Sequence, residues 1–250
     1  MLEKSDFLLI IPTFNEALNV EVLFKNLSIL RQSGTLFEVL LIDDGSPDNT
    51  AEIVRKFELK WVTVLSNKEK KGLGTAYKQG FLFASNLNYK FVVEMDADGS
   101  HKVDDLKKLL GADHAYDLVI GSRWVPGGEV VNWPVHRVLI SRIGNIYAKL
   151  LLGIKVNDST SGFRRMRVTR LRKIDLNKIS SAGYGFQVEI AHSLVEHGAK
   201  YLEIPISFVE RVHGKSKMSK EIAFEAFKIV TFMGLKRALL GISTLNKGNK

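Results

Sequence analysis

The sequence predicts an α/β fold with a mainly parallel sheet, and three observations support this prediction. Short apolar runs alternate with helical segments through the first half of the chain. This order is typical of βαβ units, whose crossovers are right-handed. Polar segments follow the ends of several of the apolar runs. The composition, with 45% hydrophobic and 25% charged residues among 250, is ordinary for a globular protein.

The predicted elements alternate in order along the chain. Strands are expected at residues 7–11, 39–42, 61–65, 91–95 and 118–120, because each is a short apolar run of the kind that buried strands show. Helices of suitable length lie between them at residues 20–30, 50–57, 73–84 and 103–110. A loop rich in Gly, Trp and Pro is then expected at residues 124–134, followed by a long helix at about residues 135–152.

The last predicted helix covers about residues 219–240 and is mostly apolar. At 100° per residue its polar side chains form a narrow stripe, made of Glu221, Glu225, Lys228 and Lys236. Such a helix is too apolar to be a free surface helix and too interrupted to span a bilayer. We expect it to lie on a bilayer surface, or to pack against a partner or the domain itself.

The net charge of +9 limits the expected partners. A basic balance indicates nucleic acid, an anionic membrane surface or phosphorylated substrates. The aromatic and basic motif of a nucleic-acid reader is absent, so we expect no nucleic acid. The chain has no cysteine, which excludes disulfides and is compatible with a reducing compartment. Neither a signal peptide nor an apolar stretch of about 18 residues is found, so we expect the chain not to cross a membrane.

The most informative motif is Asp96-Ala97-Asp98, which directly follows the apolar run at residues 91–95. Open α/β sheets bind ligands at the carboxyl ends of their strands. Two carboxylates two residues apart at such an edge can share a hard divalent cation, because Mg²⁺ and Mn²⁺ take oxygen ligands. Alone, this motif would more simply be a solvated acidic turn. Residues 12–16, 43–50 and 121–123 also place polar groups at strand ends, and together the four segments predict a nucleotide site.

These four segments, in this order and spacing, resemble those of the inverting glycosyltransferases of family 2, which have the Rossmann-like GT-A fold. Their sequences here are P-T-F-N-E, D-D-G-S-P-D-N-T, D-A-D-G-S-H and G-S-R. Three later segments, W-P-x-x-R, D-S-T-S-G-F-R and E-R-V-H-G-K-S-K-M, are similar to those of polyprenol (dolichol) phosphate mannose synthases. The similarity runs from about Phe7 to Met218. It implies a GT-A catalytic domain at residues 1–217 and an amphipathic membrane-interface or partner segment at residues 218–250.

The resemblance assigns a nucleoside pocket to residues at the first two strand ends. Its lining would be Pro12, Phe14, Glu16, Ile42 and Asp44. An aromatic face at position 14, where many members have Tyr, suits stacking on a base. The carboxylates at 16 and 44 can accept hydrogen bonds from ribose hydroxyls or base N–H groups. For Ile42, a core position is an equally good interpretation.

The resemblance also assigns a metal site. Asp96, Asp98 and Ser100 would hold Mg²⁺ or Mn²⁺, with Asp98 as the direct ligand and Ser100, where some members have Gln, as a ligand directly or through water. Ala97 is small, so its backbone can approach the sugar nucleotide closely. The cation would neutralise the diphosphate leaving group as Lewis acid and template.

Basic residues fall into two groups by resemblance. Arg123, Arg211 and Lys217 would bind the donor's phosphates, and Arg137 and Ser141 would bind the acceptor's phosphate. Arg137, Ser141, Asn145 and Lys149 recur every four residues, so they form one polar stripe on an otherwise apolar helix. A solvated face is the simpler interpretation for Lys149, and a functional role is favoured for Arg137. For His101 and His213 we expect hydrogen-bonding or structural roles in preference to catalysis as bases.

The resemblance implies a metal-dependent inverting transfer of mannose from GDP-mannose to polyprenyl phosphate, with Asp96, Asp98 and Arg123 as the catalytic residues. The expected location is peripheral, on the cytoplasmic face of a membrane, with a separate membrane-anchoring subunit as a further partner. Two alternatives stay open. One is transfer of glucose from UDP-glucose to polyprenyl phosphate, and the other is a non-catalytic nucleotide-sugar-binding module recruited to membranes.

Overall fold

The computed structural model describes residues 5–179, 181, 183–211 and 220–247. A seven-stranded sheet runs through the molecule in the order β3-β2-β1-β4-β7-β5-β8. Its strands are β1 (Phe7–Thr13), β2 (Glu38–Asp43), β3 (Val62–Ser66), β4 (Phe91–Glu94), β5 (Leu118–Ser122), β7 (Arg164–Arg167) and β8 (Tyr201–Pro205). All neighbouring strands are parallel except β7, which is antiparallel to β4 and β5. The predicted α/β fold with a mainly parallel sheet is confirmed.

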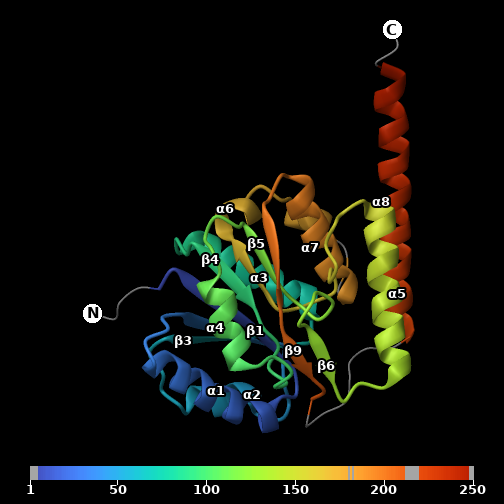
Figure 1. The fold of residues 1–250 in the computed structure, drawn as a ribbon. Helices are drawn as coiled ribbons and strands as arrows, with labels where there is room; N and C mark the ends of the chain where they lie inside the picture. Colours follow the sequence, from blue (N-terminus) through green and yellow to red (C-terminus); the bar gives the residue numbers. More distant parts are fainter. Residues whose placement is uncertain (1–4, 180, 182, 212–219, 248–250) are drawn as a thin grey trace.

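Helices cover both faces of the sheet, as the crossovers of βαβ units require (Figure 1). One face packs against α1 (Ala17–Gln32), α2 (Thr50–Arg55) and α4 (Val103–Gly111). The other packs against α3 (Leu73–Asn86), α6 (Val168–Leu171), α7 (Tyr184–Glu196) and parts of α5 (Val135–Leu152) and α8 (Lys220–Lys247). Side chains of β1 alternate between the two cores, with Leu9 and Ile11 in the first and Leu8 and Ile10 in the second.

Several elements were not predicted from the sequence. They are β7, β8, α6, α7, the short 3₁₀ helix η1 (Leu176–Lys178) and a two-stranded sheet of β6 (Glu129–Val131) and β9 (Ser207–Val209). Strand β7 has no apolar run because Arg164 and Arg165 are fully buried in it. Their guanidinium groups donate to backbone carbonyls, those of Gln187 and Ser159 for Arg164 and those of Leu110, Ala112 and Asp113 for Arg165. Buried arginines therefore concealed a central strand.

Helix α5 turns polar side chains toward the domain and apolar side chains toward solvent, which is the reverse of an ordinary surface helix. Its predicted polar stripe faces the domain: Asn145 is buried and donates to Thr160, and Lys149 donates to Asn157. The solvated-face interpretation of Lys149 is therefore wrong. The apolar side chains Val135, Leu139, Ile143, Ile146 and Leu150 are instead exposed. Globular proteins rarely present such a row of large apolar residues to water.

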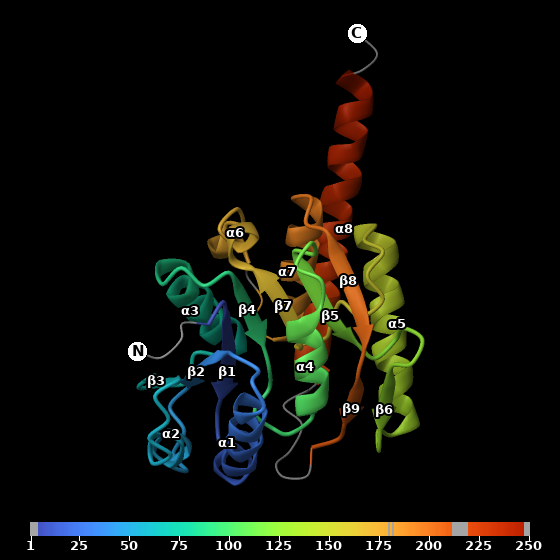
Figure 2. The same ribbon diagram turned by 60° about the vertical axis from the view of Figure 1, so that its left-hand side comes forward.

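Helix α8 packs along α5 and α7 and then extends past the domain (Figure 1; Figure 2). The ring of Tyr147 on α5 stacks on Phe227 with a centroid distance of 5.0 Å, and its hydroxyl lies 2.7 Å from that of Thr231. Apolar side chains of α8 are also exposed, namely Phe224, Phe227, Phe232, Leu235 and Leu239. Among the described residues, no helix has the length and apolar character needed to cross a bilayer.

Candidate active site

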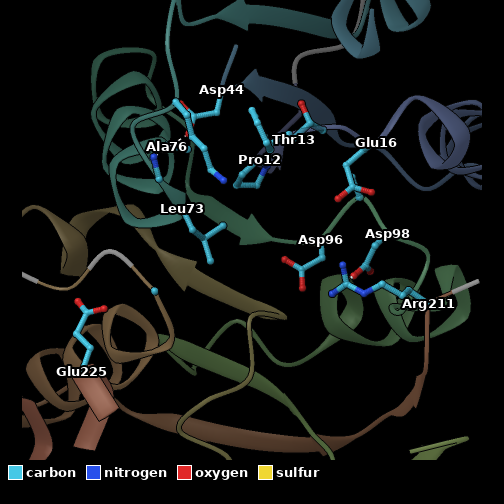
Figure 3. A pocket seen from close by; sticks show the side chains of 15 residues that line it. Pro12, Thr13, Glu16, Asp44, Leu73, Ala76, Asp96, Asp98, Arg211 and Glu225 are labelled. Carbon is cyan, nitrogen blue, oxygen red and sulfur yellow. Dashed lines mark hydrogen bonds and ion pairs between the residues drawn. The ribbon is translucent and has the colours of Figure 1, made fainter. Parts of the chain in front are cut away.

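A cavity of about 330 Å³ lies where β1, β2 and β4 end (Figure 3). Parallel strands bring their carboxyl ends to one edge of a sheet, and this is where such sheets bind ligands. Most of the residues predicted to bind the donor line this cavity: Pro12, Phe14, Glu16, Asp44, Asp96, Ala97, Asp98 and Arg211. We call it the first cavity.

The acidic turn after β4 is held in place by several hydrogen bonds. One carboxylate oxygen of Asp98 accepts from the backbone N–H of Ser100 at 3.0 Å, and the other lies 2.8 Å from the Arg211 guanidinium. The backbone N–H of Asp96 donates to Nδ1 of His101 at 3.2 Å. Gly99 has φ +78°, a left-handed conformation that glycine adopts without a Cβ clash. The turn thus aims both carboxylates into the first cavity.

His101 is a buried part of this turn. Its ring stacks on Phe163 at a centroid distance of 4.5 Å and meets Phe208 edge-on at 5.3 Å. Burial lowers the pKa of His101 to about 4, although the nearby Asp98 carboxylate acts in the opposite direction. The imidazole is therefore neutral at neutral pH and accepts from the Asp96 amide. This arrangement supports the predicted hydrogen-bonding role.

A buried polar pair lies behind the acidic turn. Glu94 ends β4 opposite Arg164 of β7, and both side chains are fully buried. Burial raises the pKa of Glu94 to about 8, while the positive charge of Arg164 opposes the shift. At neutral pH a large fraction of this carboxyl is consequently protonated.

The end of the first cavity that is predicted to take the nucleoside is bordered by the loop before α3. The Lys70 ammonium lies 4.2 Å from the centroid of the Phe14 ring. The carboxylate of Asp44 accepts from the backbone N–H groups of Lys71 and Gly72, at 2.9 and 2.7 Å. Asp44 therefore anchors this loop, in addition to lining the cavity.

The acidic turn fits a divalent cation by its donor chemistry. One or two carboxylates plus substrate phosphates is the usual coordination of Mg²⁺, and Asp96 and Asp98 both line the cavity. Ser100 does not line it, but its buried Oγ has no hydrogen-bond partner among the described residues. Among the described residues, no group of three or more Asp, Glu, His or Cys side chains is placed so that it could hold a metal ion by itself. The residues suit a cation shared with substrate phosphates.

A second cavity, of about 390 Å³, adjoins the first and shares Asp96 and Arg211 with it. Its polar lining includes Arg123, Arg137, Ser141 and Thr160. The remainder is mainly apolar and comes largely from α5 and α8, including Ile140, Ile143, Tyr147, Phe227 and Val230. The second cavity therefore has a cationic end next to the acidic turn and an apolar body between two helices.

Arg123 lines the second cavity and not the first, where the donor's phosphates are expected, and its predicted role toward the donor stays a prediction. Its Nε and Nη2 donate to the two carboxylate oxygens of Asp158 at 2.8 and 2.6 Å, with both side chains buried. Burial opposes ionisation of Asp158, but the charge and hydrogen bonds of Arg123 dominate and lower its pKa. A rigid, paired guanidinium thus faces the second cavity.

The predicted acceptor-phosphate residues, Arg137 and Ser141, both line the second cavity. Arg137 pairs with Glu210, and its guanidinium carbon lies 3.9 Å from the centroid of the Trp133 ring. Glu210 does not line the cavity, so it contacts Arg137 from outside the cavity wall.

Two other predicted residues do not belong to the described site. Ile42 is fully buried in the core and lines neither cavity, because its side chain points to the α3 face of β2. The core interpretation of Ile42 is therefore favoured. Lys217 lies outside the described residues, as does His213.

Sequence reasoning missed several residues of the site. Leu73 and Gly183 line the first cavity, and so does Glu225 of α8 (Figure 3). Asp158 was part of a recognised segment, but its pairing with Arg123 joins residues 35 positions apart and leaves no local signal. For Glu225 the signal was an acid in a mostly apolar helix.

Comparisons with known proteins agree with the predicted fold and family. The model of the family described as glycosyl transferase family 2 matches residues 8–175. Undecaprenyl-phosphate mannosyltransferase of Micrococcus luteus is 46% identical over 94% of this chain and 99% of that protein. Polyprenol monophosphomannose synthase of Mycolicibacterium smegmatis is 40% identical over 93% of this chain and 88% of that protein.

A solved structure shares the fold at low sequence identity. It is glucosyl-3-phosphoglycerate synthase of Mycobacterium tuberculosis in complex with Mn²⁺, UDP and glucosyl-3-phosphoglycerate, with a TM-score of 0.66 and 17% identity over 91% of this chain and 79% of that chain. The chain therefore belongs to glycosyl transferase family 2, and within it to the polyprenol phosphate mannose synthases that its motifs resemble.

Proposed function

We propose that the protein transfers mannose from GDP-mannose to a polyprenyl phosphate. The observation that carries this proposal is the meeting of two unlike cavities at Asp96 and Arg211. The first has the residues of a nucleotide-sugar site, and the second combines arginines with an apolar body, as a lipid phosphate requires. The names of the two bacterial relatives describe mannosyl transfer to polyprenyl phosphates, which supports the same substrates here.

In the proposed reaction, an oxygen of the acceptor phosphate attacks the anomeric carbon of mannose from the second cavity. The new carbon–oxygen bond forms as the bond to the GDP leaving group breaks, so the configuration is inverted. A phosphate monoester has a second pKa near 6 and is mostly dianionic at neutral pH. No proton has to be removed from the attacking oxygen. Arg123, Arg137 and Arg211 reduce the repulsion between the two anionic substrates.

We further propose that Asp96 and Asp98, with Ser100 directly or through water, hold Mg²⁺ or Mn²⁺ against the donor's diphosphate. The bound cation would supply charge neutralisation for the departing GDP. Arg211, which contacts Asp98 in the structure, lies where it can bind the same phosphates.

The inverted helix α5 supports a peripheral membrane location, which we propose for the cytoplasmic face. The exposed apolar side chains of α5 and α8 belong to two helices that also wall the second cavity. A lipid acceptor could thus enter from the bilayer without leaving its apolar surroundings. Basic side chains on α8, among them Lys228, Lys236 and Arg237, suit anionic lipid. A separate membrane-anchoring subunit would be an alternative occupant of this surface.

The test is transfer of radiolabelled sugar by purified full-length protein with Mg²⁺ or Mn²⁺, polyprenyl phosphate and a panel of nucleotide sugars. Labelled lipid from GDP-mannose alone is the expected result. Label from UDP-glucose would establish the other donor. Nucleotide-sugar binding without any labelled lipid would mean that the protein is a binding module. Calorimetric titration with GDP and with UDP should agree with the preferred donor.

A further inference from the structure

We propose that Glu225 of α8 accepts hydrogen bonds from hydroxyl groups of the donor's sugar and so helps to determine which hexose is transferred. This inference rests on the proposed function, because it assumes a nucleotide sugar in the first cavity. It assigns to the C-terminal helix a part in substrate recognition that is separate from membrane binding.

The position of the sugar follows from the two cavities. The acceptor oxygen must come from the second cavity and the leaving diphosphate must remain in the first, so the anomeric carbon has to lie where they meet. Asp96 and Arg211 line both cavities and mark this junction on the domain side. On the α8 side the junction lies between consecutive residues, because Glu225 lines the first cavity and Ala226 lines the second.

The nucleoside is placed at another part of the first cavity. Phe14, Lys70 and Asp44 form one end, where a base can stack and donate hydrogen bonds. Figure 3 shows Glu225 well separated from Asp44 and also from Asp98 and Arg211, so it borders a third side of the cavity. A sugar attached to the diphosphate beside Asp98 and Arg211 therefore occupies the side of the cavity that Glu225 and Gly183 line.

Helix α8 is held firmly enough to place this carboxylate. A Cβ added to Gly185 at the start of α7 would lie 3.2 Å from the side chain of Ile229, one turn after Glu225. The contacts of Tyr147 with Phe227 and Thr231 fix the same turns of α8 against α5. These three contacts set the rotation of the helix and keep position 225 in the cavity wall.

The chemistry of a carboxylate suits a sugar and not a diphosphate. A carboxylate side chain accepts hydrogen bonds, so a hydroxyl of a hexose can donate to it. The same charge would repel phosphates, so Glu225 favours the uncharged part of the donor. The simpler interpretation, a solvated stripe on an amphipathic helix, does not account for an acid at the junction of the cavities while Phe224 is exposed beside it.

The test compares binding of GDP-mannose and GDP to the full-length protein with Mn²⁺ by calorimetry, in the absence of acceptor. Glu225→Ala should weaken GDP-mannose binding by about tenfold or more, because a hydrogen bond to a charged group is lost, and should change GDP binding by less than about twofold. Glu225→Gln, which keeps the size of the side chain, should give a smaller loss in the same direction. Glu196→Gln on α7, an exposed carboxylate that lines neither cavity, is the matched control.

Equal losses for GDP and GDP-mannose would overturn the inference, because they would mean that Glu225 supports the cavity or the nucleotide. Unchanged GDP-mannose binding in both variants would also overturn it. Failure of the proposed function is a distinct result: wild-type protein would then transfer no mannose. In that case the binding comparison is made with the nucleotide sugar that the wild-type protein does use and with the corresponding nucleoside diphosphate. Thermal unfolding of each variant verifies that α8 is still packed.

Discussion

Asp98 is the single side chain whose replacement we expect to be most damaging. Asp98→Asn should lower the rate of transfer by more than about 100-fold, because loss of even an outer-shell partner of a metal costs about 10- to 100-fold. Asp96→Asn should also be severe. The exposed Asp104→Asn on α4 is the control. Steady-state rates with Mn²⁺ and with EDTA provide the measurement, and full wild-type turnover in EDTA would refute the metal assignment.

The raised pKa of Glu94 predicts how the stability of the fold depends on pH. Its pKa in the folded protein, about 8, lies above the ordinary 4.5, so the folded state holds a proton that the unfolded state loses. The contribution of Glu94 to stability is therefore fully present below about pH 4.5 and is lost as pH rises to about 8. Glu94→Gln should remove this loss, which is on the order of a few kcal/mol. Urea unfolding at pH 5 to 9 tests it, with exposed Glu52→Gln as the control; parallel pH profiles for wild type and Glu94→Gln would contradict it.

His101 should not act as a general base, because its Nδ1 already accepts from the Asp96 amide and its ring is buried. His101→Asn, whose side-chain oxygen can replace Nδ1 as acceptor, should keep more activity than His101→Phe, which keeps only an aromatic ring. Neither change should shift the acidic limb of the pH–rate profile at saturating donor. A limb that disappears with the histidine would mean that a base exists.

At the scale of elements, the exposed apolar face of α5 predicts membrane binding. Replacing Leu139, Ile146 and Leu150 by Ser should weaken binding to anionic vesicles by more than about tenfold, because each buried side chain contributes about 1.5–3 kcal/mol. None of the three lines either cavity, so donor binding should not change. Flotation with vesicles is the measurement. The same replacements at Leu18, Val22 and Ile29, exposed on α1, serve as control, and equal losses in both variants would show that the α5 face has no special role.

Whether a strand or helix could be predicted from the sequence depended on which residue types it buries. Strands such as β2 are buried on both faces and read as apolar runs, so they were found. Strand β7 was missed because arginine is usually an exposed residue, so a segment with two buried arginines does not look like a buried strand in the sequence. The periodicity of α5 was visible, but it does not tell which face meets the domain when the apolar face is the exposed one.

The same limit applies to the site. The rule that parallel strands end at one edge brought Phe14, Asp44 and Asp98 together from sequence alone. The side chains that complete the site come from chain segments without such a rule, as Asp158 and Glu225 do. The predicted division at residues 217 and 218 also needs a qualification. Helix α8 walls both cavities, so deleting it would impair substrate binding as well as membrane binding.

For the whole molecule, we expect the two cavities to divide substrate binding between them. Arg137→Ala should raise the KM for polyprenyl phosphate by about tenfold or more, since a hydrogen-bonded charge pair with the phosphate is lost. The affinity for GDP should stay within about twofold, because Arg137 does not line the first cavity. Arg142→Ala, an exposed arginine of α5 that lines neither cavity, is the control. A loss of GDP affinity equal to the loss for the acceptor would mean that the cavities are not separate sites.

Glu210 and Arg211 are consecutive residues just after β9, and each pairs with a residue of a different cavity. Glu210 binds Arg137 of the second, and Arg211 binds Asp98 of the first. If a donor that draws Arg211 away from Asp98 also moves the backbone at this position, Glu210, which is held against Arg137, moves with it. We therefore predict that occupancy of one cavity is coupled energetically to occupancy of the other. By reciprocity, whatever factor the donor imposes on acceptor affinity, the acceptor imposes on donor affinity.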